Sequence, residues 1–342
     1  MKGFFEHPWC CGPDRGYTGR PTVLGEVGPE DAPALLVMAH SDVVPMNNDP
    51  SQWKVTGPFQ PAIRDGAIYG RGCSDDKWGI ACMIHILRAL HDDATPLRKR
   101  LIFASTIDEE NGVGNGLLLL HLAGLEPEAA FYLDGVDHVL SIGNLGGSNL
   151  YLHLPGGLTR DRLTALEGKL IAACEQVSAG RRSLFTGLFA DNDMADHSVF
   201  ARLHENGPLV LHFYTLPGED GDAFGRQLES VAREALGGEV DEIGFSYRTP
   251  WFEPTVMDAD HPFVQGLAAS FRAVYGRDAL VSTVSKQDSF IMRKVGIPTV
   301  GFGPGAFHGP GAAHQPDERL RIDDLHAALR FSHQAVCDWL AV

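Results

Sequence analysis

The chain has 342 residues, of which 44% are hydrophobic and 21% are charged, values typical of a globular protein with a substantial core. Its formal net charge of −16 argues against nucleic acid or an anionic membrane as the main partner, because both require a basic surface. No apolar run approaches the roughly 18 residues of a membrane-spanning helix, and the N-terminal segment lacks the apolar stretch of a secretory signal. The six cysteines form no CxxC pair, which favours reduced thiols in a cytoplasmic protein.

In chain order, the first half alternates short apolar runs with a helical pattern. Residues Ala34–His40, Arg100–Asp108 and Glu128–Gly135 are predicted as strands, the first two of them buried. Between the first two strands, apolar residues recur at helical spacing over Asp75–His91. Strands that alternate with helices are typical of an α/β domain whose sheet is mostly parallel and covered by helices on both faces.

The middle of the chain has a different pattern. Two helical stretches alternate there with apolar strands in LVLHFYTLPGED and VDEIGFSYRTP. We therefore predict a smaller α+β domain over residues 149–256, inserted into a larger domain that comprises residues 1–148 and 257–342. The helices predicted from the middle to the end of the chain are Leu158–Val177, Asp222–Leu236, His261–Tyr275 and Ile322–Leu340, with a strand in IPTVGFG before the last of them.

Acidic and imidazole side chains occur at five places that follow predicted strands or lie in loops. They are His40 with Asp42, Asp75 with Asp76, the run Asp108–Glu110, Asp134, and His314. In open α/β sheets, ligands collect at the carboxyl ends of the strands. Each place alone has an ordinary structural explanation, such as a helix N-cap for the aspartate pair. Three adjacent carboxylates, however, repel one another and are costly without a cation or exposure to water.

Taken together, these places favour a metal site. Two histidines and several carboxylates are the donors that Zn²⁺ prefers, and carboxylate oxygens can be shared between two ions. The two-residue spacing of His40 and Asp42 along an extended segment places both on one side, so Asp42 is expected to hold the ring of His40. The sequence contains no HExxH, P-loop or GxSxG motif that would indicate another chemistry.

Longer strings carry a family resemblance. They are VMAHSDVVP, WKVTGPFQPAIRDGAIYGRGCSDDK, STIDEENG, YLDG, LPGED and GIPTVGFGPG…AAHQPDERL, in this order between about Gly25 and Leu325. With them the sequence resembles the metallohydrolase family of glutamate carboxypeptidase, aminoacylase, acetylornithine deacetylase and succinyl-diaminopimelate desuccinylase. The resemblance implies a zinc-exopeptidase-like catalytic domain with an inserted lid and dimerisation domain. It also implies cleavage of an amide bond in a small N-acyl amino acid, dipeptide or related amide.

The resemblance further implies two divalent metal ions per chain, zinc foremost, with cobalt or manganese as alternatives. His40 and Asp134 are expected to bind one ion, Glu110 and His314 the other, and Asp75 to bridge them. The family also forms homodimers through the inserted domain, so a homodimer is expected here.

Two further residues take catalytic roles by the same resemblance. Asp42 is expected to orient His40, and Glu109 to act as the general base that takes a proton from the water shared between the metals. A cis peptide is expected after the bridging aspartate, between Asp75 and Asp76.

The inserted domain departs from the family pattern. The family shows Asp-x-Arg before a Leu-Pro-Gly turn, and that arginine commonly grips a substrate carboxylate. Here the stretch reads HFYTLPG, with His212 and Tyr214 in those places. Arg293 or Arg182 is a candidate replacement, and Trp78, where glycine is common, is expected to narrow the pocket.

Two alternatives remain beside a hydrolase of carboxylate-bearing amides. One is a hydrolase whose substrate lacks the usual free carboxylate, and the missing arginine motivates it. The other is a non-catalytic binding or regulatory protein of the same fold. The intact Glu109 argues against the second alternative, since an inactive relative is expected to lose its base or a metal ligand.

Overall fold

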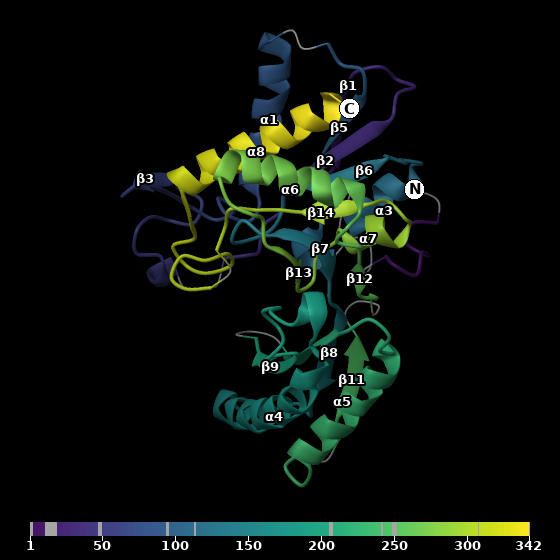
Figure 1. Ribbon diagram of the computed structural model, residues 1–342. Coiled ribbons are helices and arrows are strands. Elements are labelled where there is room, and N and C mark those ends of the chain that lie inside the picture. The colour runs from purple at the N-terminus through teal and green to yellow at the C-terminus, as the bar shows by residue number, and fades with distance from the viewer. Residues whose placement is uncertain are drawn as a thin grey trace.

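The computed structural model describes two bodies, each built around its own β-sheet (Figure 1). The larger body contains both ends of the chain, and the smaller one lies below it in this view. The described residues are 3–10, 19–46, 50–93, 96–112, 114–204, 208–240, 242–247, 252–306 and 308–341.

The larger body is organised around an eight-stranded sheet in the order β1-β5-β2-β6-β14-β7-β12, with β13 also paired to β7. Pairing is parallel from β5 through β2 and β6 to β14, and between β13 and β7. The pairs β1–β5, β14–β7 and β12–β7 are antiparallel. The strands are β1 Val23–Val27, β2 Ala34–His40, β5 Arg100–Thr106, β6 Ala129–Tyr132, β7 Leu140–Asn144, β12 Thr255–Val256, β13 Val281–Val284 and β14 Thr299–Gly301.

Helices cover both faces of this sheet, and β2 shows why. All seven residues of β2 are buried, and successive side chains point to opposite faces. Leu35 and Val37 pack in one core with helices α1, α6 and α8, whereas Leu36 and Met38 pack in a second core with α3 and α7. The helices of the larger body are α1 Lys77–Asp92, α2 Glu109–Gly112, α3 Asn115–Leu122, α6 Pro262–Tyr275, α7 Phe290–Lys294 and α8 Ile322–Ala341, with the short 3₁₀-helix Pro50–Gln52 (η2).

A three-stranded sheet at the side of the larger body joins two distant loops. Its order is β15-β4-β3, formed by Arg319–Arg321, Ala67–Tyr69 and Ala62–Arg64. Leu320 of β15 lies opposite Ile68 of β4 in an antiparallel pair. This pairing brings the loop that ends in β15 beside the loop that leads from β4 into α1.

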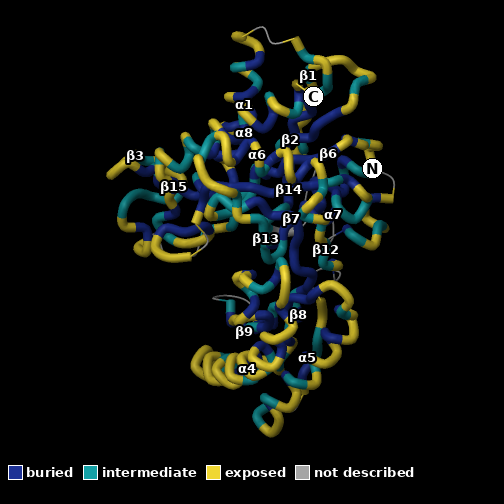
Figure 2. Tube along the Cα trace, viewed as in Figure 1, coloured by how far each residue is buried: buried dark blue, intermediate teal, exposed yellow. Residues whose placement is uncertain are grey.

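The smaller body is a four-stranded antiparallel sheet in the order β11-β8-β10-β9. Helices α4 and α5 cover one face through a core of leucines and phenylalanines, and the outer side of α4 is exposed (Figure 2). β8 begins three residues before the predicted boundary at 149, and β12 lies in the larger sheet although it falls within the predicted insert. The elements are β8 Gly146–His153, α4 Arg160–Arg181, η3 Arg182–Leu184, η4 Gly187–Phe189, β9 Val199–Leu203, β10 Leu209–Thr215, α5 Gly221–Leu236 and β11 Gly244–Tyr247.

The fold confirms the predicted α/β sheet and its predicted strands and helices. One difference matters for the site: α1 begins at Lys77 rather than at Asp75, so both aspartates lie in the preceding loop. Strands β1, β7, β9 and β13 were not predicted, because they are short or carry no clear apolar alternation.

Candidate metal centre

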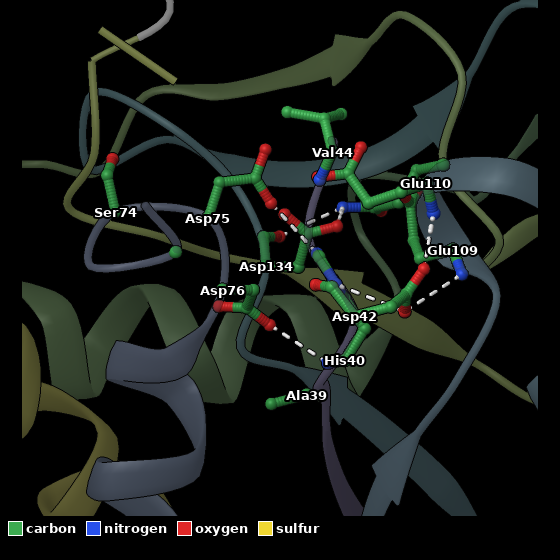
Figure 3. A network of polar contacts seen from close by, with 12 residues as sticks. Ala39, His40, Asp42, Val44, Ser74, Asp75, Asp76, Glu109, Glu110 and Asp134 are labelled. Atoms are coloured by element: carbon green, nitrogen blue, oxygen red, sulfur yellow. Dashed lines mark hydrogen bonds and ion pairs between the residues drawn. The ribbon is translucent and has the colours of Figure 1, made fainter. Parts of the chain in front are cut away.

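Two groups of potential metal ligands meet at one edge of the large sheet. One consists of His40, Asp75 and Asp134, and the other of Asp75, Glu110 and His314. Within each group the ligand atoms lie within 4.8 Å of one another, and Asp75 belongs to both. Figure 3 shows the carboxylates of Asp75, Glu110 and Asp134 turned toward the ring of His40. The five residues predicted as metal ligands are therefore brought together.

Strand topology explains why these residues meet. β2, β5 and β6 are parallel neighbours, so their carboxyl ends lie at the same edge of the sheet. His40 is the last residue of β2, Glu110 lies in α2 shortly after β5, and Asp134 follows β6. Asp75 arrives on the loop between β4 and α1, and His314 on the loop before β15, which the three-stranded sheet holds together.

In the first group, the ring of His40 is fully buried and its orientation is fixed. Its Nδ1 lies 3.0 Å from the backbone oxygen of Asp42 and 3.6 Å from that residue's carboxylate. A carbonyl oxygen only accepts, so one ring proton belongs on Nδ1, and Nε2 is the nitrogen that can bind a metal ion once it loses its own proton. That Nε2 lies 2.8 Å from Oδ1 of Asp75. Asp42 thus lies in the position expected of a residue that orients the ring of His40.

In the second group, Nε2 of His314 lies 3.0 Å from Oδ2 of Asp75 and 3.0 Å from Oε2 of Glu110. The other carboxylate oxygen of Glu110 accepts the backbone N–H of Val44 at 3.1 Å. His314 has a positive φ of 65° and a side chain that is 44% exposed, in contrast to the buried ring of His40. The second group is therefore the more open of the two.

Glu109 lies beside both groups on the first turn of α2. The carboxylate of Asp42 accepts the backbone N–H groups of Glu109 at 3.3 Å and Glu110 at 3.1 Å. These donors are two of the N-terminal N–H groups that a helix leaves unpaired, so Asp42 fixes the start of α2 as well as the ring of His40. Burial, together with the charges of Asp134 and Glu110, raises the pKa of Glu109 well above its usual value.

The electrostatics of the cluster call for a cation. Burial first, and then the charge of Asp75, raises the pKa of Asp134 to about 6. Burial works against the charged ring of His314, but the hydrogen bonds that the ring donates to the carboxylates of Asp75 and Glu110 raise its pKa to about 10. Burial likewise opposes the charged form of Asp75, yet its bonds to His314 and His40 hold its pKa well below the usual range. Buried carboxylates with protonated imidazoles between them form a site in which divalent cations can replace the protons.

Two of the supporting residues were not predicted. Asp76 sits at the N-cap position of α1, but its side chain makes no cap bond; it accepts the backbone N–H of His40 at 3.1 Å instead. Glu318 is fully buried and binds the loop that carries Asp75. The predicted cis peptide between Asp75 and Asp76 is confirmed.

Two of the residues proposed to contact substrate are buried. Trp78 is 3% exposed and packs edge-on against Phe302 in the core beneath the sheet, so it does not narrow a pocket. Tyr214 is 9% exposed, and the ammonium of Lys286 lies 5.0 Å from its ring centroid.

The two candidate arginines are already engaged by the protein. The guanidinium of Arg293 donates to Thr255, Asn144, Ser289 and the backbone oxygen of Thr299. Arg182 pairs with Asp196 of the smaller body at 2.9 Å. Neither position supports the prediction of a substrate-gripping cation.

Comparison with known proteins identifies the family. Residues 36–338 match the model described as peptidase family M20/M25/M40. The chain belongs to this family. The resemblance drawn from its motifs is thereby confirmed, and as a member of peptidase family M20/M25/M40 the chain is a metal-dependent hydrolase of amide bonds.

Individual relatives of the M20/M25/M40 chain differ in what they act on. The N-formyl-4-amino-5-aminomethyl-2-methylpyrimidine deformylase of Bacillus subtilis (strain 168) is 24% identical over 366 residues, covering 94% of this chain and 84% of that protein. A succinyl-diaminopimelate desuccinylase of Thioalkalivibrio sulfidiphilus is 26% identical over 332 residues, covering 88% and 82%. The di-peptidase Dug1p of Saccharomyces cerevisiae has a similar fold, with a TM-score of 0.74 at 16% identity and coverage of 98% and 86%. Within the described ranges, none of the helices combines the length and apolar character that a bilayer crossing requires.

Proposed function

We propose that the chain is a dinuclear amidohydrolase of small molecules, in which Asp75 bridges two metal ions. The observation that carries this proposal is the position of the Asp75 carboxylate between the two histidines. Its Oδ1 lies 2.8 Å from Nε2 of His40, and its Oδ2 lies 3.0 Å from Nε2 of His314. One carboxylate that faces two separate donor groups has the arrangement of a bridging ligand. His40 and Asp134 then complete one site, and Glu110 and His314 the other.

The donor set fits zinc, which we propose as the metal, with cobalt or manganese as alternatives. Imidazole nitrogen and carboxylate oxygen are both zinc ligands, and three protein ligands per ion leave a position open for water or substrate. When bound, two divalent ions supply Lewis-acid chemistry, lowering the pKa of a water and polarising the amide carbonyl.

The chain's own residues then supply positioning and proton transfer. Glu109 lies next to Glu110 at the start of α2, and burial with the charges of Asp134 and Glu110 raises its pKa, so its carboxylate is a stronger base than a free one. We propose that its carboxylate takes the proton of the attacking water and delivers it to the leaving nitrogen. Asp42 holds Glu109 through the backbone N–H at the start of α2, while its own backbone oxygen fixes the ring of His40. A single residue thereby positions both a ligand and the base.

Two classes of amide are candidates for the substrate. N-acyl amino acids and dipeptides carry a free carboxylate, and the names of the desuccinylase and the dipeptidase indicate such substrates for those proteins. The deformylase relative acts, by its name, on a formylated aminomethylpyrimidine, which has no carboxylate. We therefore keep amides without a carboxylate as a specific alternative. Arg293 and Arg182, the two candidates for binding a substrate carboxylate, already bind groups of the protein itself.

A substrate panel on zinc-loaded protein tests the function and separates these classes. The panel pairs N-formyl and N-acetyl arylmethylamines with N-acyl amino acids and simple dipeptides. Turnover of any amide that disappears in Glu109→Gln, while the metal content is retained, supports the proposal. Full turnover by Glu109→Gln would remove Glu109 as the base. Preference for the neutral amides would identify a substrate without a carboxylate, whereas preference for the acyl amino acids would contradict that assignment.

We also propose a homodimer formed through the inserted domain, and a cytoplasmic location. β9 and β11 are the two edges of the four-stranded sheet, and edge strands offer unpaired backbone groups for association. Tyr247 on β11 is 42% exposed at this edge. The cysteines of the described segments are free thiols, which accords with a reducing compartment. Light scattering that reports a monomer would contradict the dimer, and a dimer unaffected by Tyr247→Lys would place the contact elsewhere.

A further inference from the structure

A chain of hydrogen bonds leads from α7 to Asp134. Arg293 donates an N–H of NH2 to Oγ of Ser289 at 2.7 Å, and Ser289 donates its hydroxyl to Oε1 of Gln287 at 2.5 Å. Nε2 of Gln287 then donates to Oδ2 of Asp134 at 3.0 Å and to its backbone oxygen at 2.9 Å. Ser289 and Gln287 are buried, with 0% and 3% exposure. The family resemblance of the sequence gives no role to Gln287, Ser289 or this series of hydrogen bonds.

The two ends of this series of hydrogen bonds fix the direction of its bonds. A guanidinium can only donate, so the oxygen of Ser289 must accept from Arg293. The backbone oxygen of Asp134 can also only accept, so the amide of Gln287 turns its NH2 group to Asp134 and its oxygen to the hydroxyl proton of Ser289. An isolated glutamine amide can be reversed with little change in shape, and the backbone oxygen of Asp134 removes that freedom because it requires an N–H donor. Asp134 consequently always receives N–H donors.

We propose that Gln287 is a positioning residue for metal binding, which holds the carboxylate of Asp134 by one oxygen and leaves the other for the ion shared with His40. The inference rests on the proposed dinuclear function. The inference goes beyond that function because Gln287 is not itself a metal ligand and lies in a different segment from the five predicted ligands. The amide of Gln287 donates both of its N–H groups to Asp134, one to the carboxylate and one to the backbone oxygen. Two bonds to one residue fix the carboxylate against rotation, which a single bond would not.

The same loop also touches the inserted domain. Nζ of Lys286, next to Gln287 in sequence, donates to the backbone oxygen of Ser148 at 3.3 Å and to Oδ1 of Asn149 at 3.0 Å, both on β8. The backbone N–H of Leu145, just before β8, donates to the carbonyl of Ser285 at 3.1 Å. Residues 285–289 are therefore supported from both bodies, which makes this loop a rigid base for orienting a ligand.

The test uses Gln287→Met, which keeps the length of the side chain and removes its donors. The matched control is Gln334→Met, because Gln334 also donates its amide to a carboxylate, that of Asp338 at 2.7 Å, but on the exposed side of α8. Zinc affinity is measured by competition with a chromogenic chelator, and the environment of the ions by the visible absorption of Co²⁺-loaded protein. Outer partners of metal ligands typically change affinity by about 10- to 100-fold. We expect a loss of that size for one of the two ions in Gln287→Met, with an altered Co²⁺ spectrum, and no change in Gln334→Met.

Two further variants keep the inference open to refutation. Gln287→Glu places an acceptor against Asp134 and is expected to weaken the same ion more than Gln287→Met does. Ser289→Ala leaves the amide in place but removes the hydroxyl that donates to its oxygen, so a smaller weakening of the same ion is expected, also if Gln287→Met fails to fold. If the wild type binds two ions and the Gln287 and Ser289 variants bind them equally well with unchanged spectra, only this inference fails. If the wild type binds no ion, the proposed function fails with it.

Discussion

Replacement of Glu318 by glutamine is expected to destabilise the protein and to disturb the metal centre together. The carboxylate of Glu318 is fully buried and accepts the backbone N–H groups of Gly72, Ser74 and Asp75 at distances of 3.0 to 3.2 Å. It also accepts an N–H of Arg71 at 2.7 Å. Arg71 in turn reaches the backbone oxygen of His314 at 3.4 Å. One buried ion pair therefore supports the loops of two predicted ligands, Asp75 and His314.

The magnitude follows from what glutamine can and cannot replace. Its amide keeps one acceptor oxygen, but its NH2 group must face backbone N–H groups or the guanidinium, none of which accepts a hydrogen bond. Arg71, 5% exposed, loses its partner, and breaking a buried pair from one side costs about 3–5 kcal/mol. Lost hydrogen bonds to a charged group contribute about 1.5–3 kcal/mol each, but they overlap with that figure. We therefore expect a loss of about 3–5 kcal/mol in the free energy of unfolding of the metal-free protein.

Urea unfolding of metal-free protein measures the stability, and elemental analysis of zinc-loaded protein measures the site. The matched control is Glu219→Gln, since Glu219 pairs with the buried Arg181 at 2.5 Å in the inserted domain and contacts none of the predicted ligands through a hydrogen bond or ion pair described for it. The control is expected to lose stability but to keep its full metal content, whereas Glu318→Gln loses both. A change in unfolding free energy below about 1 kcal/mol, the size of an ordinary substitution, with normal metal content would refute this reasoning.

Three further predictions concern the centre itself. Glu109→Gln is expected to abolish turnover while both ions stay bound, because the amide keeps the shape of the side chain but accepts no proton; normal activity would contradict this. His314→Ala is expected to lose one ion preferentially, and elemental analysis that finds unchanged stoichiometry would exclude His314 as a ligand. Burial raises the pKa of Asp134 from 3.8 to about 6. The protonated side chain therefore stabilises the folded protein below pH 3.8, its pKa in the unfolded chain, and this contribution is lost as the pH rises through about 6. The unfolding midpoint of metal-free protein is therefore expected to fall between about pH 4 and pH 6, and zinc to remove most of that fall; equal slopes with and without zinc would argue against it.

The ligand residues could be predicted from the sequence because the fold determines their positions in a simple way. His40 and Asp134 end parallel neighbouring strands that read as apolar runs, so their convergence follows from the sheet alone. Asp75 and His314 lie on loops with no such rule, and the family resemblance located them. What joins those loops, the antiparallel pairing of β15 with β4, involves strands of three residues each, which are too short to show a pattern.

The supporting residues could not be predicted, because their roles depend on tertiary contacts. Gln287 is a neutral amide in the chain, and only the approach of Asp134, more than a hundred residues earlier, makes it a donor to a ligand. Glu318 follows His314 closely, but nothing in the sequence indicates that its carboxylate turns back toward Gly72 and Ser74. Trp78 was misjudged for a related reason. It lies in the first turn of α1, close to Asp75 in sequence, yet its side chain points into the core.

The measurement that tests the dinuclear centre most directly is the number of metal ions per chain. Protein is purified without chelators, reloaded with zinc, freed of unbound metal and examined by elemental analysis. The shared carboxylate of Asp75 between the two histidines predicts close to two ions per chain. No bound zinc after reloading would contradict the proposed centre and with it the proposed mechanism.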